Sequence, residues 1–517
     1  MPMTHRLLRS VFVLCLVLAV GAAAAQDSGR GRGNRGGDRP SDTNASERHD
    51  PAPPGGGILR LLPADQVTDH EIDTTQGKLA YTATAGTLSF FDQSGEKSAA
   101  IFYTAYVKKD AAENRPVTFV FNGGPGAASA YLHLGMAGPR ILDLGPGGRD
   151  AAHAELRDNP DTWLAFTDLV FIDPVGTGWS RTAKADDAKH FYSVRADADA
   201  MAKAIALYVL HNNRASSPKY LFGESYGGLR AAKTARALQH DQGIGVTGIV
   251  MLSPLLEGSM TFGDTGSALH AALQLPSLAA AELERKNAFS PGALAAAEKF
   301  AMTDYLTTLA GPAPQGDAAK AFYERVAKMT GMSVDDVTQA RGFVGDIYVK
   351  RLRASDGKIV SHYDATFAVD DPFPELRSSR GSDPILDGIS RAYGGAMASY
   401  ARNELGFKTE MTYILLGDAS RDWDWQGGRA QVTTDDDLRT LLAFDPSFHL
   451  LIAHGYSDMV TPFGMTRYIL NHLPQIGAPG RAELKLYRGG HMIYIDPASR
   501  KAFTADAAAF YRAAGKS

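Results

Sequence analysis

The sequence predicts an α/β fold in which helices flank a mostly parallel central sheet. Short, continuous apolar runs are typical of strands buried on both faces of such a sheet, and they recur at residues 117–121, 168–173, 220–222, 247–253, 411–416, 448–453 and 484–487. Apolar residues with the i, i+4, i+7 spacing of a helix occur within 201–208 and 503–510. Strands that alternate with helices favour an open sheet with right-handed crossovers.

Other segments set the limits of this sheet. Residues 98–107 alternate in polarity, which predicts a half-exposed strand. Residues 256–400 are rich in alanine and helix-forming residues, with proline and glycine interruptions and few strand signals. We therefore expect one α/β domain built from residues 58–255 and 401–517, with 256–400 as a largely helical cap inserted over one end of the sheet.

The N-terminal region has the pattern of an export signal. Basic side chains precede an apolar run, Val11 to Val20, and small residues follow as far as Ala25. We expect residues 1–25 to be a signal peptide cleaved after Ala25, because the run is short for a membrane span; an uncleaved anchor is the alternative. Residues 26–57 are rich in glycine, proline and arginine and are expected to be a disordered linker. The exported chain, periplasmic or secreted, would then have no stable membrane anchor.

Composition excludes several classes of function. The 517 residues carry a net charge of −4, so no bulk positive field favours nucleic acid, and no nucleic-acid partner is expected. Cys15, the only cysteine, lies inside the N-terminal apolar run. The mature chain would therefore have neither a thiol nucleophile nor a cysteine-bound metal. No EF-hand loop, HExxH motif or phosphate-binding loop occurs, and neither a metal nor a cofactor is expected.

Ser225 lies at the centre of a G-x-S-x-G pattern, 223-GESYG-227. A serine at a sharp turn between a strand and a helix needs small residues two positions away, because larger side chains would clash. Apolar residues 220–222 precede this serine, and a helical pattern over 229–240 follows it. Such a turn places the hydroxyl at a helix N-terminus, where negative charge is stabilised. We therefore predict that Ser225 is a nucleophile rather than a structural turn residue.

A serine nucleophile needs a histidine base that is oriented by a carboxylate. In this architecture the acid and then the histidine follow later strands. Asp458 lies just beyond the apolar run 448–453, and His491 lies just beyond the run 484–487. We predict these two as the acid and the base. His454 and Asp445 are the competing candidates, and for His454 a buried structural role is favoured.

A glycine-rich segment, 122-NGGPGAAS-129, follows the apolar run 117–121. Glycines after an early strand let backbone N–H groups face a reacting carbonyl without a Cβ in the way, so the segment is a candidate oxyanion loop. Its partner would be the backbone N–H of Tyr226. By itself the segment would be interpreted as a Gly-Pro turn.

Four blocks in order resemble a known family: 122-NGGPGAAS-129, 173-DPVGTGWS-180, 223-GESYGG-228 and 490-GHMIYIDP-497. They resemble the serine carboxypeptidase family, α/β-hydrolases that remove C-terminal residues from peptides. The resemblance covers roughly residues 80–260 and 405–510. It implies an α/β-hydrolase fold, an acyl-enzyme intermediate and peptide or protein C-termini as substrates, in a bacterial, exported member of the family.

The resemblance also implies roles for individual residues. Ser225, Asp458 and His491 would form the catalytic triad. The backbone N–H groups of Gly124 and Tyr226 would form the oxyanion hole. The family binds the terminal carboxylate of its substrate through residues that correspond here to Asn122, Gly123 and Glu224. A protonated Glu224 could donate a hydrogen bond to that carboxylate, which requires a raised pKa.

The sequence departs from the family at positions near this carboxylate site. Val120 stands where the family has tryptophan, Met136 where it has a second glutamate, and Ala127 where it has a cysteine. Arg140 or Arg488 could supply a substitute positive charge, although both are more typical of surface arginines. An esterase, another peptidase or an acyltransferase with the same fold and triad is therefore the alternative function, and a non-catalytic binding protein is a further one.

Overall fold

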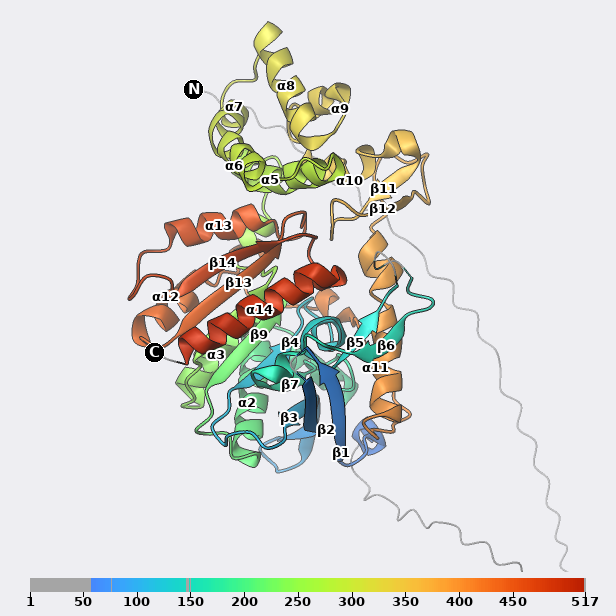
Figure 1. Ribbon diagram of the computed structural model, residues 1–517, viewed down its shortest axis with the longest axis vertical. Helices are drawn as coiled ribbons and strands as arrows, with labels where there is room; N and C mark the ends of the chain where they lie inside the picture. Colours follow the sequence, from blue (N-terminus) through green and yellow to red (C-terminus); the bar gives the residue numbers. More distant parts are fainter. Residues whose placement is uncertain (1–56, 76, 146–147, 149, 516–517) are drawn as a thin grey trace, which may run out of the picture. The chain divides into compact units, whose positions relative to one another are not determined.

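The structure is a computed structural model that describes residues 57–75, 77–145, 148 and 150–515 (Figure 1). The chain divides into two units, Met1–Ala52 and Pro53–Ser517, and the following concerns the second. The expected signal peptide, 1–25, and the expected linker apart from its last residue lie outside the described residues. Within the described part of the chain, no helix combines the length and apolar character needed to cross a membrane.

A ten-stranded sheet forms the centre of this unit, with the order β1-β2-β3-β7-β4-β9-β10-β13-β14 and β8 paired with β3. Strands β7 to β14 of this order are mutually parallel, whereas β1, β2, β3 and β8 pair in antiparallel fashion. The strands of the sheet are β1 (Gln66–Thr74), β2 (Gly77–Phe91), β3 (Lys97–Lys108), β4 (Val117–Phe121), β7 (Asp168–Ile172), β8 (Arg181–Thr182), β9 (Lys219–Glu224), β10 (Gly248–Leu252), β13 (His449–Gly455) and β14 (Ala482–Tyr487).

Helices cover both faces of this sheet and bury a separate apolar core on each. One core contains side chains of α2, α3 and α12, and the other contains side chains of α11 and α14. In Figure 1, α14 lies across the strands β9 and β13. The bounds of these helices are α2 (Val194–His211), α3 (Tyr226–Asp241), α11 (Ala392–Asn403), α12 (Asp435–Phe444) and α14 (Pro497–Ala514). A mostly parallel sheet between two helical layers, with a serine turn after β9, is the α/β-hydrolase fold, so the predicted fold class is confirmed.

Residues 268–351, between β10 and α11, are mostly helical and have an apolar core of their own. That core includes Leu278, Tyr305, Val326 and Tyr348, and it also includes Met459 from the loop after β13. Helix α13 (Phe463–His472) also packs against the sheet, because Ile469 and Leu470 contact the core that contains α2 and α3. The remaining strands and α-helices are α1 (Ala130–Leu132), β5 (Arg140–Asp143), β6 (Glu155–Asp158), α4 (Gly258–Thr261), α5 (Ala268–Arg285), α6 (Pro291–Phe300), α7 (Leu306–Ala310), α8 (Gly316–Thr330), α9 (Val334–Gln339), α10 (Gly345–Arg351), β11 (Lys358–Val360) and β12 (Ala368–Asp370).

Two predicted strands differ from the structure. Residues 98–107 lie in β3, where Ala99 to Tyr106 are all buried, so the strand is not half-exposed. The reason is that β3 lies inside the sheet, and its alternate side chains enter the two cores on opposite faces. Residues 411–416 form no strand. Their backbone bonds instead to glycine-rich loops, with Gly178 N donating to Ile414 O at 2.7 Å and Ala128 N donating to Leu415 O at 2.8 Å.

Candidate active site

Ser225 occupies a sharp turn between β9 and α3. Its φ of 61° lies in the left-handed region, which is strained for a residue with a side chain. The two flanking glycines make the turn possible: a Cβ at Gly223 would lie 1.9 Å from the carbonyl oxygen of Gly227, and a Cβ at Gly227 would lie 2.7 Å from that of Phe121. The steric argument made from the sequence therefore applies in the structure, and the candidate nucleophile lies at the N-terminus of α3.

The predicted acid and base meet at the carboxyl ends of β13 and β14. His491 Nδ1 lies 2.9 Å from Asp458 Oδ2, and both side chains are buried. Asp458 also accepts hydrogen bonds from Val460 N at 2.8 Å and from the hydroxyl of Thr461 at 2.9 Å. Burial by itself lowers the pKa of His491, but the charge and the hydrogen bond of Asp458 more than offset this, so the pKa is raised. The pair is thus arranged to stabilise an imidazolium.

The competing residues, His454 and Asp445, make other hydrogen bonds. His454 is fully buried on β13, and its Nε2 lies 2.8 Å from the hydroxyl of Thr466. Burial lowers the pKa of His454 to about 4, so this ring is neutral at physiological pH. Asp445 accepts hydrogen bonds from the backbone N–H and the hydroxyl of Ser447 at the end of α12. His454 Nδ1 also lies 4.0 Å from Asp458 Oδ2, so this buried ring is a neighbour of the predicted acid.

Glu224 and Asn122 lie side by side next to the candidate nucleophile. Asn122 Nδ2 donates to Glu224 Oε2 at 2.5 Å, and the Asn122 amide oxygen accepts from Leu132 N at 3.0 Å, which fixes its orientation. The phenol of Tyr494 lies 3.1 Å and 3.2 Å from the two oxygens of Glu224. Burial raises the pKa of Glu224 to about 7, although His491 and these two hydrogen bonds act in the opposite direction.

The predicted oxyanion groups lie against the same turn. A Cβ at Gly123 would lie 2.5 Å from Tyr226 N, so only glycine allows this approach. Gly124 has a φ of 99°, which also requires glycine, and its bond to Pro125 is cis. Tyr226 is the first residue of α3, and the first N–H groups of a helix have no acceptor within it.

One cavity of about 160 Å³ brings most of these residues together. Asp458 is not among its lining residues, because it lies behind His491. The predicted site residues that line the cavity are Asn122, Gly123, Gly124, Glu224, Ser225, Tyr226 and His491.

One part of the chain is similar to a known protein family. A family model described as serine carboxypeptidase matches residues 77–287, which contain β9, Ser225 and the glycine-rich loop. Residues 77–287 are therefore similar to the serine carboxypeptidase family. Asp458 and His491 lie outside the matched residues.

Curated serine carboxypeptidases match only part of the chain. Retinoid-inducible serine carboxypeptidase of Mus musculus is 31% identical over 141 residues, which are 26% of this chain and 28% of the relative. Serine carboxypeptidase-like 42 of Arabidopsis thaliana is 27% identical over 173 residues, which are 32% of this chain and 35% of the relative. The chain thus matches about a third of the length of these curated relatives.

Solved structures that align with the chain are more distant in sequence. Proline iminopeptidase of Mycobacterium smegmatis is 16% identical with a TM-score of 0.38, covering 83% of this chain and 98% of that one. A lipase in an open form is 16% identical with a TM-score of 0.33, covering 83% of this chain and 99% of that one.

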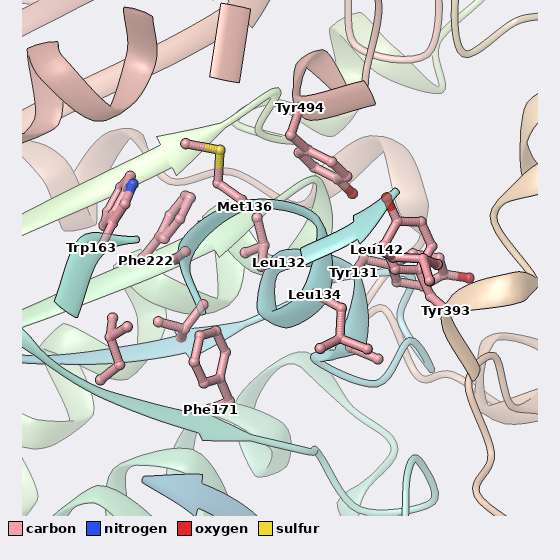
Figure 2. Close-up of a cluster of buried hydrophobic side chains, with 14 of the residues drawn as sticks. Tyr131, Leu132, Leu134, Met136, Leu142, Trp163, Phe171, Phe222, Tyr393 and Tyr494 are labelled. Atoms are coloured by element: carbon pink, nitrogen blue, oxygen red, sulfur yellow. The ribbon is translucent and has the colours of Figure 1, made fainter. Parts of the chain in front are cut away.

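The departures from the serine carboxypeptidase family pattern are all in buried positions. Val120 and Met136 are fully inaccessible, and Met136 lies in the apolar cluster that Figure 2 shows together with Trp163 and Phe222. Neither arginine considered as a substitute charge lines the cavity beside Ser225: Arg140 pairs with Asp158 and Glu404, and Arg488 pairs with Glu284 at 3.2 Å. The structure therefore brings neither arginine to the predicted carboxylate site.

Tyr363 and Asp364, between β11 and β12, contact the loops that carry the predicted base and acid, and the sequence did not indicate these contacts. His491 N donates to Tyr363 O at 2.6 Å, and the Tyr363 ring stands edge-on to the imidazole, with 5.1 Å between ring centroids. Ser457, next to the acid, donates to Asp364 at 2.7 Å. The bond from Val460 N to Asp458 is the missed contact that has a sequence signal, because aspartate side chains commonly accept from the backbone N–H two residues on.

Proposed function

We propose that the protein is a serine-type carboxypeptidase that releases C-terminal residues from peptides through an acyl-enzyme intermediate. Ser225 Oγ would attack the last peptide carbonyl while His491 Nε2 accepts the hydroxyl proton. The negative oxygen of the tetrahedral intermediate would face the N–H groups of Gly124 and Tyr226. The imidazolium of His491 would be stabilised by Asp458.

The two halves of the reaction use the same histidine. When the C–N bond breaks, His491 would give its proton to the leaving amine, and the acyl group would remain on Ser225 as an ester. Water would then lose a proton to His491 and attack the ester carbonyl. Collapse of the second intermediate would return that proton to Ser225 Oγ and release the shortened peptide with a new carboxylate.

The observation that carries this proposal is the buried pair of Asn122 and Glu224 beside Ser225. Because burial raises the pKa of Glu224 to about 7, its carboxyl is neutral in acidic solution and can donate a hydrogen bond to a carboxylate. Leu132 N donates to the amide oxygen of Asn122, so the NH2 group of Asn122 faces Glu224 and donates to it. A site that offers two polar donors at one end of a small cavity suits a free C-terminus.

The test compares a blocked dipeptide that has a free C-terminal carboxylate with the same peptide amidated. We expect a higher kcat/KM for the free acid below pH 7, with Ser225→Ala as the blank. Hydrolysis that requires Ser225 but shows no preference at any pH would favour the alternative, an esterase, another peptidase or an acyltransferase. Failure of a fluorophosphonate to label Ser225 in folded protein would favour a binding protein.

We also propose that the chain is exported as a bacterial protein, with residues 1–25 acting as a cleaved signal peptide. The support is the order of basic, apolar and small residues in that segment. N-terminal sequencing of protein recovered from a periplasmic fraction or culture medium would test it. A mature chain that begins at Gln26 is expected, whereas retention of Met1 would contradict the proposal.

A further inference from the structure

Tyr494 contacts Glu224, and the family resemblance assigned it no role. Its side chain is buried, it lines the catalytic cavity, and its phenol oxygen lies 3.1 Å and 3.2 Å from the two oxygens of Glu224. Tyr494 follows His491 by three residues, so it is carried by the same loop as the candidate base. No other tyrosine hydrogen-bonds to Glu224 among the residues that the structure describes.

The chain makes room for this ring next to the position where the family has its second glutamate. A Cβ at Gly135 would lie 2.6 Å from Cε2 of Tyr494, so any side chain at residue 135 would meet the ring. The next residue, Met136, is fully buried and apolar. Figure 2 shows Met136 and Tyr494 within one cluster of side chains. The phenol thus supplies a polar hydrogen to Glu224 in a region that has lost a carboxyl group.

We propose that Tyr494 is a positioning residue for substrate recognition: its phenol donates a hydrogen bond to Glu224 and sets the pH range over which Glu224 can donate to the substrate's carboxylate. The inference rests on the proposed carboxypeptidase function. The number of polar hydrogens on Glu224 and Tyr494 explains why recognition of the carboxylate depends on pH. A neutral Glu224 and a phenol carry two polar hydrogens, so one remains for the substrate. When Glu224 is ionised, the phenol hydrogen is used by Glu224, and the pair repels a carboxylate.

The direction of the effect follows from the hydrogen bond. A phenol that donates to a carboxylate stabilises the ionised form, so removal of the hydroxyl raises the pKa of Glu224 above its value of about 7. Tyr494→Phe removes the phenol hydroxyl and leaves the other titratable groups around Glu224 in place. The titratable groups that face Glu224 are His491, Asp458, Tyr131, Tyr363 and Tyr393, besides Tyr494 itself.

The experiment compares wild type with Tyr494→Phe and measures kcat/KM for the free-acid and amidated peptides between pH 5 and 9. We expect kcat/KM for the free acid, divided by kcat/KM for the amide, to fall with rising pH. The pH at the midpoint of this fall should be about one unit higher in Tyr494→Phe than in wild type. Tyr393→Phe is the matched control, since it removes a phenol from the same cluster and should leave the midpoint unchanged. Equal midpoints in wild type and Tyr494→Phe would overturn the inference, even if all rates fell together.

Two further measurements separate this inference from the proposed function. Gly135→Ala keeps the phenol but displaces the ring, and it should move the midpoint in the same direction as Tyr494→Phe. If wild type shows no free-acid preference at any pH, the proposed function fails. The hydrogen bond between Tyr494 and Glu224 is then tested by infrared titration, which measures the pH at which the Glu224 carboxyl ionises. The Glu224 band is identified by its loss in Glu224→Gln. A band that ionises at the same pH in wild type and Tyr494→Phe would refute it without reference to turnover.

Discussion

The buried carboxyl of Glu224 makes folding stability depend on pH, and Glu224→Gln removes that dependence. The ordinary pKa of this group is 4.5, and burial raises it to about 7 in the folded protein. The folded state therefore binds the proton more tightly than the unfolded state does between these values. Stability falls as pH rises from about 4.5 to about 7 and is constant above that range.

The size of the effect follows from the two pKa values. At about 1.4 kcal/mol for each tenfold change in proton affinity, the difference between 4.5 and about 7 corresponds to about 3 kcal/mol. Glutamine has nearly the same shape, can accept from Asn122 and carries no charge at any pH. Glu224→Gln should therefore gain about 3 kcal/mol relative to wild type between pH 4.5 and pH 8.

The assay is urea-induced unfolding of wild type and Glu224→Gln at both pH values. Glu483→Gln on β14 is the control, because that carboxyl is exposed to water in the folded protein as well. A difference between Glu224→Gln and wild type that stays the same at both pH values would refute the reasoning. It would mean that Glu224 ionises in the folded protein as easily as in water.

Three other substitutions test the site and its support. Asp458→Asn should lower kcat about 10³- to 10⁴-fold with little change in far-UV circular dichroism, because the imidazolium of His491 loses its charged partner; a loss below tenfold would contradict the assignment of the acid. Asp197→Asn leaves the buried guanidinium of Arg230 without its ion pair at 2.7 Å and should cost about 3–5 kcal/mol in urea-induced unfolding, whereas no change would show the pair to be unimportant. Gly223→Ala should abolish fluorophosphonate labelling of Ser225, since its Cβ would lie 1.9 Å from a carbonyl oxygen, and labelling at the wild-type rate would contradict the steric account.

The features that could be predicted from the sequence are those that local physics determines. Strands such as β4 and β10 are buried on both faces, and this forces the continuous apolar runs by which they were located. The turn at Ser225 requires two glycines at fixed positions, so its pattern is visible in five residues. The same logic misplaced residues 411–416, where an apolar run satisfies its backbone against glycine loops instead of a neighbouring strand.

Contacts between segments far apart in the sequence could not be predicted from any local sequence pattern. Tyr494 and Glu224 are 270 positions apart, and a tyrosine after a histidine motif has neither the periodicity nor the spacing of a recognised site. The contact of Tyr363 with His491 likewise joins the cap to a catalytic loop across many intervening elements. Such pairs arise only when the sheet order is fixed, which the local pattern of the sequence does not determine.

The absence of a second acid need not remove recognition of a free C-terminus. Two adjacent carboxyl groups keep a proton because their negative charges repel, but burial of a single carboxyl has the same effect on its pKa. Here burial is the largest cause of the raised pKa of Glu224, and the apolar Met136 belongs to the cluster that buries Tyr494. The preference for the free acid over the amide should therefore depend on pH, because an assay at pH 8 alone would compare the two substrates when Glu224 is ionised. The decisive comparison is therefore the one made below pH 7, where the carboxyl of Glu224 can still donate.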